Sequence, residues 1–515
     1  MYRILSASKD SYITNKYVGG ERCETSNVGQ AGTLDLYKLY DETTIVGVTS
    51  SIVEMSRLLV KVDYSSLSTF DYSNPSFSCF LHLKDVYGGQ TTPSNFTIEM
   101  FPLSKSFDEG RGSDVVGLRD VDTCNWLSAS ATTPWVSPGA GATGSLGGTL
   151  DALTDVGLFK QTFERGDEDL LIDITSHVSA SLAGIIQNHG FRIGLSSSLE
   201  EDTNTYFVKR FGSKQAYDKH LQPRLVVKTS SDILEDSMGF PLFNVSQSLF
   251  VYNQVNGVYS NFISGSTSLS GQDCLLLKLE ASKSFTYTTS SWSTSHSASI
   301  NHLTRSVASW STQYSGSQVT SSFGVGIPGT YKSDMFVSTF DSSLRDYLSG
   351  STDLELKVTW TSLDSSVVYA EDWAYFNNLQ GGFGNIQPKN WVINITNLQQ
   401  TYSKNVTTPA RLRLFIQNYD LTNALTKLPS RTPSQIVKNM KWRLIEAYTK
   451  KVVIPFDPCT RLSFDRDGMY FDIWTSDLDL NQVYQIDFLN DVDNSLTPSE
   501  QTLFQNSAFK FKIVN

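Results

Sequence analysis

The sequence predicts an all-β protein built from several sandwich domains. Apolar and polar residues alternate in many short segments, as at Leu58, Val60 and Val62, which is the period of a strand with one buried face. Breaks rich in Ser, Thr and Gly separate these segments. No regular alternation of strands and helices is present, so a parallel α/β sheet is excluded. At 515 residues the chain exceeds one ordinary core and fits two to four domains.

Composition narrows the class further. A hydrophobic content of 39% and an aromatic content of 12% suffice for packed cores and exclude general disorder. The net charge of -11 comes without any cluster of Lys and Arg in the sequence, which predicts that the protein does not bind nucleic acid. No run of about 18 apolar residues occurs, and Met1 to Ser6 contain no signal-peptide core, so we expect a soluble chain without membrane insertion.

The cysteines predict buried, unbridged thiols. They are odd in number and widely spaced, and none forms a Cys-x-x-Cys pair, which argues against a disulfide framework and a zinc site. The five residues are Cys23, Cys79, Cys124, Cys274 and Cys459.

The first predicted domain covers residues 1–230. Strands with one buried face are expected around Leu58–Val62, Cys79–Leu83 and Phe96–Met100. No charged residue lies between Asp122 and Asp151, where Gly, Ser, Thr and Pro are frequent, so this stretch is predicted to be a long ordered loop on the sandwich.

The stretch from Asp173 to Lys228 closes this domain. Apolar residues at helical spacing predict a short helix with Thr175 or Ser176 as N-cap and Gly190 as the left-handed stop. Three strands are expected to follow, at residues 191–195, 205–211 and 223–228. The apolar positions of the helix are Val178, Leu182, Ile185 and Ile186.

The same stretch resembles a known family. Its motifs Gly190–Ser196, Phe207–Ser213 and Gln222–Val227 are similar to the end of a DNRLRE-type, carbohydrate-binding-module-like jelly-roll domain. The likeness extends upstream to Ala7–Ile13, Asn27–Gly29, Ser56–Val60 and the loop from Asn125–Trp126 to Pro134–Trp135. The whole chain also resembles virion structural proteins of large tailed bacteriophages. That resemblance implies a jelly-roll-like first domain with further β domains behind it.

A second β-sandwich domain is predicted over residues 231–396. Alternation at Leu354–Trp360 and at Trp391–Ile395 marks two of its strands. Between Lys283 and Gly324 the only charged residue is Arg305, and Ser and Thr dominate. Low-charge strands of this kind are typical of a sheet that packs against a neighbour, so we expect this segment to be an assembly surface. The open alternative is that its aromatic residues form the domain's own core.

A third, immunoglobulin-like β domain is predicted over residues 397–515. Alternating apolar residues mark strands at 412–416, 469–473, 484–488 and 509–513. The Asp467-Gly468 step predicts a hairpin turn, because Gly accepts the positive φ that the turn requires. A short helix is expected near Ser434–Asn439.

Motifs for catalysis, metals and cofactors lack the context that their chemistry needs. Gly139–Gly144 fits G-x-G-x-x-G, but prolines precede it and glycines follow, whereas the motif needs a preceding strand and a following helix. Asp491–Ser495 begins like a calcium loop but continues without the required Gly and Glu. The acidic runs 167–169 and 200–202 are interpreted as solvated turns. No catalytic spacing of His or Ser is present. We therefore predict no cofactor, no metal and no enzymatic activity.

Aromatic loops remain as candidate binding sites. Tryptophans in such loops stack on sugars in carbohydrate-binding modules, although tryptophans of β-sandwiches more often lie in cores or protein interfaces. The candidates for glycan or interface contact are Trp126, Trp135, Trp292 and Trp310.

These observations and the resemblance together predict a non-enzymatic structural component of a tailed-phage virion, from the tail, baseplate, neck or capsid. It would be made in the bacterial host cytoplasm and would assemble with other virion proteins and with copies of itself. Two alternatives stay open: a host-surface carbohydrate-binding adhesin, whose partner is a host glycan, and a polysaccharide-degrading enzyme.

Overall fold

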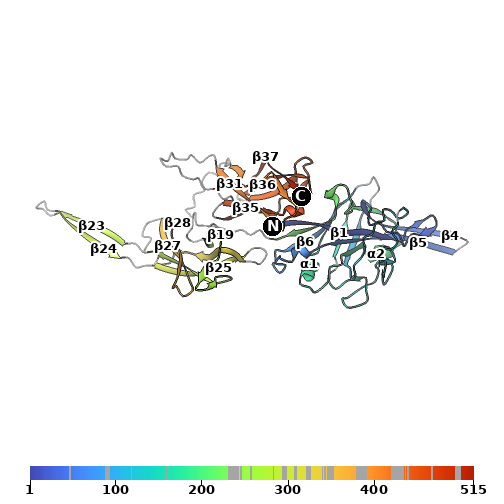
Figure 1. Cartoon of the computed structure of the whole chain (residues 1–515), viewed down its shortest axis with the longest axis horizontal. Coiled ribbons are helices and arrows are strands. Elements are labelled where there is room, and N and C mark those ends of the chain that lie inside the picture. Colours follow the sequence, from blue (N-terminus) through green and yellow to red (C-terminus); the bar gives the residue numbers. More distant parts are fainter. Residues whose placement is uncertain are drawn as a thin grey trace.

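The computed structural model describes most of the chain and confirms the all-β class. The described residues are 1–45, 48–86, 93–117, 119–157, 159–229, 243, 246–255, 258–281, 284–292, 298–306, 310–320, 326–338, 340–341, 344, 353–377, 391–418, 434, 437, 440–465, 468–492 and 500–515. Within them the α-helices are short, α1 (Thr175–Leu182) and α2 (Ser197–Glu201), and strands make up most of the regular structure. No described helix has both the length and the apolar character required to cross a membrane. The molecule is elongated, with a two-stranded hairpin projecting at each end (Figure 1).

The first domain is a sandwich made by one continuous sheet that folds over. Its strand order is β12-β7-β14-β5-β1-β16-β6-β13, and β4 joins β15 to the far part of β5. The strands are β1 (Tyr2–Thr14), β4 (Thr33–Ile45), β5 (Val48–Val62), β6 (Ser78–Leu83), β7 (Phe96–Pro102), β12 (Phe159–Phe163), β13 (Leu170–Asp173), β14 (Phe191–Leu195), β15 (Tyr206–Gly212) and β16 (Arg224–Lys228).

Strand β1 connects the two layers of this sandwich. Residues 2–6 pair with β16, whereas residues 7–14 pair with β5, and the register shifts between Ala7 and Lys9. A bulge at this position bends the strand and increases its twist, which allows one strand to serve both layers. The core between the layers includes the stacked rings of Phe96 and Phe163, whose centroids lie 4.8 Å apart.

The predicted helix of the first domain is present but ends earlier than expected. Gly184 (φ +75°) is its left-handed stop, and not Gly190. The N–H of Gly184 donates to the carbonyl of Ser181, and the N–H of Ile185 donates to that of Ala180, which is the Schellman pattern. The helix also begins earlier than expected: its N-cap is Ile174, and not Thr175 or Ser176, and the side chain of Asp173 accepts the N–H of Thr175 at 2.9 Å. Ile185 is 69% exposed, because it lies beyond the helix.

The three strands predicted after the helix are confirmed as β14, β15 and β16. They do not lie side by side: β14 inserts between β7 and β5, β15 lies at the edge beside β4, and β16 lies between β1 and β6. All of β14 is buried, including Arg192, which the alternation had assigned to a solvent-facing side. Its guanidinium lies 4.8 Å from the ring of Phe101 and donates to the carbonyl of Ala140 at 3.1 Å.

The charge-poor loop between Asp122 and Asp151 is ordered, as predicted. It contains the short pairs β8 (Ser128–Ser130) with β9 (Thr133–Pro134) and β10 (Thr143–Gly144) with β11 (Ala152–Leu153). The fully buried carboxylate of Asp151 organises it, because it accepts backbone N–H groups of Val136, Ser137 and Ala142 and pairs with Lys105 at 3.0 Å.

In the second predicted domain the described residues form one bent six-stranded antiparallel sheet. Its order is β17-β26-β25-β22-β27-β28. The strands are β17 (Ser246–Tyr252), β22 (Leu275–Ala281), β25 (Trp310–Thr320), β26 (Gly326–Phe336), β27 (Asp353–Thr361) and β28 (Val368–Asn377). Strand β25 pairs with β22 through residues 310–316 and with β26 through residues 317–320, so it links two parts of the bend.

Between β22 and β25 the chain forms a separate hairpin. Strands β23 (Ser284–Trp292) and β24 (Ala298–Ser306) pair through nine consecutive residue pairs, from Ser284 opposite Ser306 to Trp292 opposite Ala298. We call this hairpin the arm. It projects from the second domain at the end of the molecule opposite to the β4–β5 hairpin (Figure 1).

The third domain is a sandwich of a four-stranded and a five-stranded sheet that share one core. The first runs β29 (Trp391–Ile395), β31 (Ala410–Asn418), β35 (Gly468–Ile473), β34 (Ser463–Asp465). The second runs β30 (Thr401–Ser403), β37 (Glu500–Val514), β36 (Val483–Val492), β32 (Met440–Glu446), β33 (Val452–Ile454).

Strand β29 differs from the expected domain division. The sequence analysis assigned Trp391–Ile395 to the second domain, whereas the strand pairs with β31 of the third. Alternation identified the strand but carries no information on its partner. A hairpin connects β34 and β35, as expected, but Gly468 (φ +118°) pairs with Asp465 and begins β35, so the turn is not at the Asp467-Gly468 step. Residues 466 and 467 lie outside the described residues. The helix expected at 434–439 falls largely outside the described residues.

The thiol prediction is confirmed. All five cysteines are free, four are buried, and Cys459 is partly exposed. Burial raises the pKa of Cys124 to about 12 and raises the pKa of Cys79 well above its usual value, which leaves both thiols protonated and unreactive near neutral pH.

Candidate functional site

The two tryptophans predicted in the first domain lie under the loop that contains them. Trp126 is 6% exposed and Trp135 is 5% exposed. The indole N–H of Trp135 donates to the carbonyl of Asn125 at 2.9 Å. The ring of Trp126 packs against Gly139, so closely that a Cβ added to Gly139 would come within 2.5 Å of the ring. The guanidinium of Arg57 lies 5.4 Å from the centroid of the same ring. Neither ring presents a face to a sugar in this arrangement; both attach the loop to the sheet.

The other two predicted tryptophans lie in the second domain. Trp310 is 7% exposed and belongs to the core of the six-stranded sheet, which accords with the core alternative. Tyr314 packs against that core and donates its hydroxyl to the carbonyl of Phe336 at 2.7 Å. Trp292 ends β23 opposite Ala298, and its side chain lies outside the described residues. The four tryptophans are therefore not brought together.

The motifs set aside in the sequence have structural roles where they are described. At the glycine-rich segment, Gly139 and Ala140 have positive φ and the short strand β10 follows instead of a helix. Glu168 accepts the N–H groups of Glu164, Arg165 and Gly166, and these bonds lower the pKa of its carboxyl to about 2 against the opposing effect of burial. The calcium-like segment lies largely outside the described residues. Elsewhere in the described chain, no group of three His, Cys, Asp or Glu could hold a metal ion.

The largest cluster that the sequence analysis missed joins the first domain to the third. Arg3 on β1 is 4% exposed, and its guanidinium lies 4.0 Å from the ring of Trp474 and 5.6 Å from that of Phe70. It donates to both carboxylate oxygens of Asp477, at 3.1 and 3.0 Å, and the N–H of Ile4 donates to the same carboxylate at 3.1 Å. A buried bidentate pair of this kind fixes both orientation and distance.

Apolar residues continue this contact, which we call the junction. Tyr2, Ile4 and Val226 belong to the same buried cluster as Leu478 and Tyr484 of the third domain. Further ion pairs across this contact are Lys228–Asp457 at 2.7 Å, Lys219–Asp479 at 3.3 Å, and Lys451–Asp218. The imidazole Nε2 of His220 lies 3.2 Å from a carboxylate oxygen of Glu446. The first and third domains therefore pack as one body, although about 160 residues separate them in the chain.

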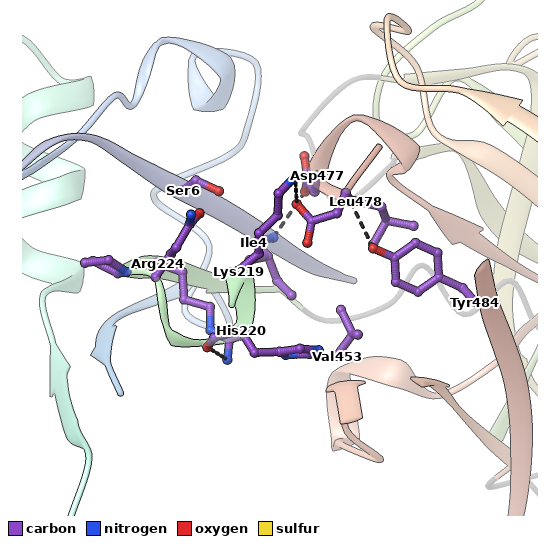
Figure 2. A pocket seen from close by; sticks show the side chains of 12 residues that line it. Ile4, Ser6, Lys219, His220, Arg224, Val453, Asp477, Leu478 and Tyr484 are labelled. Atoms are coloured by element: carbon purple, nitrogen blue, oxygen red, sulfur yellow. Dashed lines mark hydrogen bonds and ion pairs between the residues drawn. The ribbon is translucent and has the colours of Figure 1, made fainter. Parts of the chain in front are cut away.

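The junction encloses a small polar cavity (Figure 2). Its volume is about 40 Å³, which is room for a few water molecules and far below the size of an ordinary ligand pocket. Arg224 lies beside it, and its Nη2 donates to the carbonyl of His220 at 3.3 Å (Figure 2). Burial lowers the pKa of Arg224 and also the pKa of His220. The geometry fits a hydrated domain contact and not a substrate site.

Sequence alone gave one weak signal of the junction. Met1–Leu5 is apolar apart from Arg3, whereas a strand with one solvent-exposed face normally alternates apolar and polar residues. The pattern therefore indicates a strand that is covered on both faces. The partners of Arg3 in the third domain, Trp474 and Asp477, lie more than 470 positions away, and nothing in a local pattern connects them to it.

Comparisons with known proteins do not assign the chain to a family. No protein-family model and no curated protein matches the sequence. Among solved structures the chain is similar to E. coli alpha-2-macroglobulin in its native conformation, at 9% identity and a TM-score of 0.13. It is also similar to a mutant Salmonella alpha-2-macroglobulin, at 9% identity and a TM-score of 0.12. In both comparisons 99% of this chain is covered, and it spans 30% of the other chain. Likeness at this level carries no argument about fold or function.

Proposed function

We propose that this protein is a non-enzymatic structural component of a tailed-phage virion that acts through protein–protein assembly. The observation that carries the assembly role is the arm, the isolated β23–β24 hairpin that projects from the second domain (Figure 1). The class of particle comes from the resemblance of the sequence motifs given above.

The arm has the features of a strand donor or acceptor. Each of its strands pairs only with the other among the described strands, so both outer edges leave backbone N–H and C=O groups without strand partners. The nine pairs run without a register shift, and the two strands contain no Pro and one formal charge, Arg305. Isolated edges are normally protected by charge, Pro or bulges. A two-stranded hairpin is marginally stable alone in water, and a third strand from a partner would stabilise it.

The rest of the molecule suits a component that presents such an arm. The junction packs the first and third domains into one body through the Arg3–Asp477 pair and a shared apolar cluster. A smaller contact, where Phe250 and Val319 of the second domain pack on Tyr470, connects the second domain to this body. An arm carried on a rigid body can be placed at a fixed position in an assembly.

Shortening the arm tests the proposal. Residues 284–306 are replaced by a short Gly-Asn-Gly linker, and the variant is compared with the parent by thermal melt and by incorporation into particles during infection. A matched control removes residues 42–51 at the tip of the β4–β5 hairpin. We expect the arm variant to melt like the parent and to be lost from particles. Incorporation at the parental level by a folded arm variant would overturn the role of the arm.

A further inference from the structure

The third domain carries a hollow on the outer face of its five-stranded sheet. Its volume is about 310 Å³, which is at the lower end of the range for small-molecule sites. We call it the basic hollow, and its lining residues are Arg443, Ile445, Lys450, Val452, Gln485 and Gln505. They come from β32, β33, β36, β37 and the turn between β32 and β33.

The floor of the basic hollow is an ordered polar network. The side chain of Asp487 is fully buried, although it lies on the face of β36 that points away from the domain core. It accepts hydrogen bonds from Arg443 Nε at 2.9 Å, from Gln485 at 2.9 Å and from Gln505 at 3.3 Å. Arg443 Nη2 completes the ion pair at 2.8 Å. Lys450 donates to the carbonyl oxygen of the Gln485 side chain at 3.0 Å.

Such a network is not required to stabilise the outer face of a sheet. Burying a carboxylate costs free energy even when it is paired, and ordinary polar residues would cover this face at no such cost. A fully bonded network does hold its side chains in fixed positions, which is what a binding site needs. The guanidinium of Arg443 also lies 4.9 Å from the ring of Phe456, and its Nη1 donates to no acceptor among the described residues. Lys450 keeps two further N–H donors for a ligand.

A bulge in β37 lies at the same place. Gln485 pairs with Lys510, but Asp487, two residues further along β36, pairs with Gln505, five residues back along β37. Two residues of β36 are therefore matched by five residues of β37, which has three extra residues at this point. These extra residues separate the side chain of Lys510 from that of Gln505 along the strand. Bulges of this kind are frequent next to functional sites, where they redirect side chains.

The charge of this face is opposite to that of the whole protein. Directly paired residues share a face of a sheet, so Lys510 opposite Gln485 and Lys441 opposite Leu489 lie on the same side as Arg443. Lys512, opposite Val483, lies on this side as well. With Lys450 the described side chains on this side include five cationic residues and the carboxylate of Asp487, on a chain of net charge -11. A local excess of positive charge attracts anions from solution.

We propose that the basic hollow binds a small polyhydroxylated anion, such as a sugar with one carboxylate or phosphate group. Lys450 and the free Nη1 of Arg443 pair with the anionic group. The amides of Gln485 and Gln505 bond to hydroxyls, and Ile445 and Val452 contact the apolar face of the ring. This inference goes beyond the assembly role and does not depend on it, because the arm lies in another domain.

Titration calorimetry with three matched probes tests the site. Glucuronate supplies the carboxylate, glucose 6-phosphate supplies the phosphate, and glucose supplies neither. We expect at least one anionic sugar to bind saturably, and glucose to bind about tenfold more weakly or not at all. Which of the two anions binds more tightly identifies the anionic group. Equal binding of all three sugars, or no saturable binding of either anion at low ionic strength, would refute the proposal.

Two substitutions and a matched control locate the binding. Lys450→Gln removes a rim cation without disturbing Asp487, and Val452→Trp fills the hollow from its exposed side. Each should weaken binding of the anionic sugar about tenfold or more, with an unchanged melt. Lys451→Gln changes the next residue, whose ammonium pairs with Asp218 outside the hollow, and should bind like the parent. Equal effects of the Lys450 and Lys451 changes would point to general charge and not to this site. The arm-shortened variant should bind like the parent.

Discussion

Several charged side chains lie inside the sheets of this protein, and each is held by defined partners. Lys38 has no exposed side-chain surface and donates to the carbonyl of Leu199 and to Asp202, both at 2.7 Å. Lys209 pairs with Asp85 and donates to the carbonyls of Gly166 and Glu168, both at 2.8 Å. The ammonium of Lys38 connects β4 to helix α2 and the residue after it, and that of Lys209 connects β15 to the segment before β13.

Lys209 allows a measurement of how much such a contact stabilises the fold. Lys209→Ala leaves Asp85 and two carbonyl groups without their donor, so we expect a loss of about 3–5 kcal/mol in the free energy of unfolding. The double variant with Lys209→Met and Asp85→Asn removes both charges and should recover part of that loss. Urea denaturation measures both. If the double variant is as unstable as Lys209→Ala, the cost comes from lost packing and not from the unpaired charge.

Asp10 provides a second prediction at this scale, concerning pH. Its carboxyl is 1% exposed, and burial raises its pKa to about 7, with Glu109 also raising it and the bonds and charge of Lys214 opposing. Because the folded pKa lies above the unfolded one, the folded state holds an extra proton between about pH 4 and pH 7. This contribution to stability is present below pH 4 and is lost as the pH rises to 7, at up to about 1.4 kcal/mol per pH unit.

The variant Asp10→Asn isolates that contribution. Its stability relative to the parent should increase steadily from pH 4 to pH 7, because Asn keeps an acceptor for the N–H of Lys214 and does not ionise. Chemical denaturation at several pH values measures the difference. A difference that stays constant with pH would mean that Asp10 titrates near its ordinary value.

At the scale of elements, most strand positions could be predicted from the sequence and their partners could not. The alternation at Leu58 to Val62, or at Phe191 to Leu195, depends only on residues two apart, so it is visible locally. The insertion of β14 between β7 and β5 depends on residues about ninety and one hundred and thirty positions away. The burial of Arg192 was missed for the same reason, since the loop that covers it belongs to a different part of the chain.

Two glycines near helix α1 show how tertiary contact decides the effect of a substitution. Gly184 has φ +75° and open space around its Cβ position, so Gly184→Ala should cost roughly 1 kcal/mol from backbone strain alone. Gly190 has φ +96°, and a Cβ there would lie 2.7 Å from the carbonyl oxygen of Val60. Gly190→Ala should therefore cost clearly more, above about 2 kcal/mol. Midpoints of urea denaturation at unchanged slope measure both; equal costs would contradict the backbone contact at Gly190.

At the scale of the whole molecule, the sequence indicated three blocks of strands but not how they associate. The junction depends on Arg3 meeting Asp477 and Trp474, and on Tyr2 and Ile4 meeting the core of the third domain. Contacts between such distant residues leave no periodic signal. The basic hollow could not be predicted from the sequence for a related reason. Arg443, Lys450 and Gln505 are far apart in the sequence and come together only because three strands pair in this register.

The junction predicts how a cut chain behaves. A specific protease site placed within residues 231–240 would separate residues 1–230 from the rest, and we expect the two fragments to elute together in size-exclusion chromatography. Arg3→Glu places a like charge against the buried Asp477 and should make the cut fragments separate. Lys9→Glu changes a partly exposed residue on the same strand, whose ammonium pairs with Asp108 within the first domain, and should leave the fragments associated. Separation of the parental fragments would show that the junction does not hold the domains together.

The junction also sets an order of events when the chain folds. Tyr2 and Ile4 on β1 belong to the same core as Phe511 and Ile513, so that core cannot close until the chain has been synthesised through residue 513. Contacts between residues so far apart in the sequence form slowly, because closing the long loop between them costs conformational entropy before the contacts can stabilise the fold. Until that core closes, the face of the first domain that carries Tyr2, Ile4 and Val226 stays uncovered, and this apolar face can associate with other nascent chains.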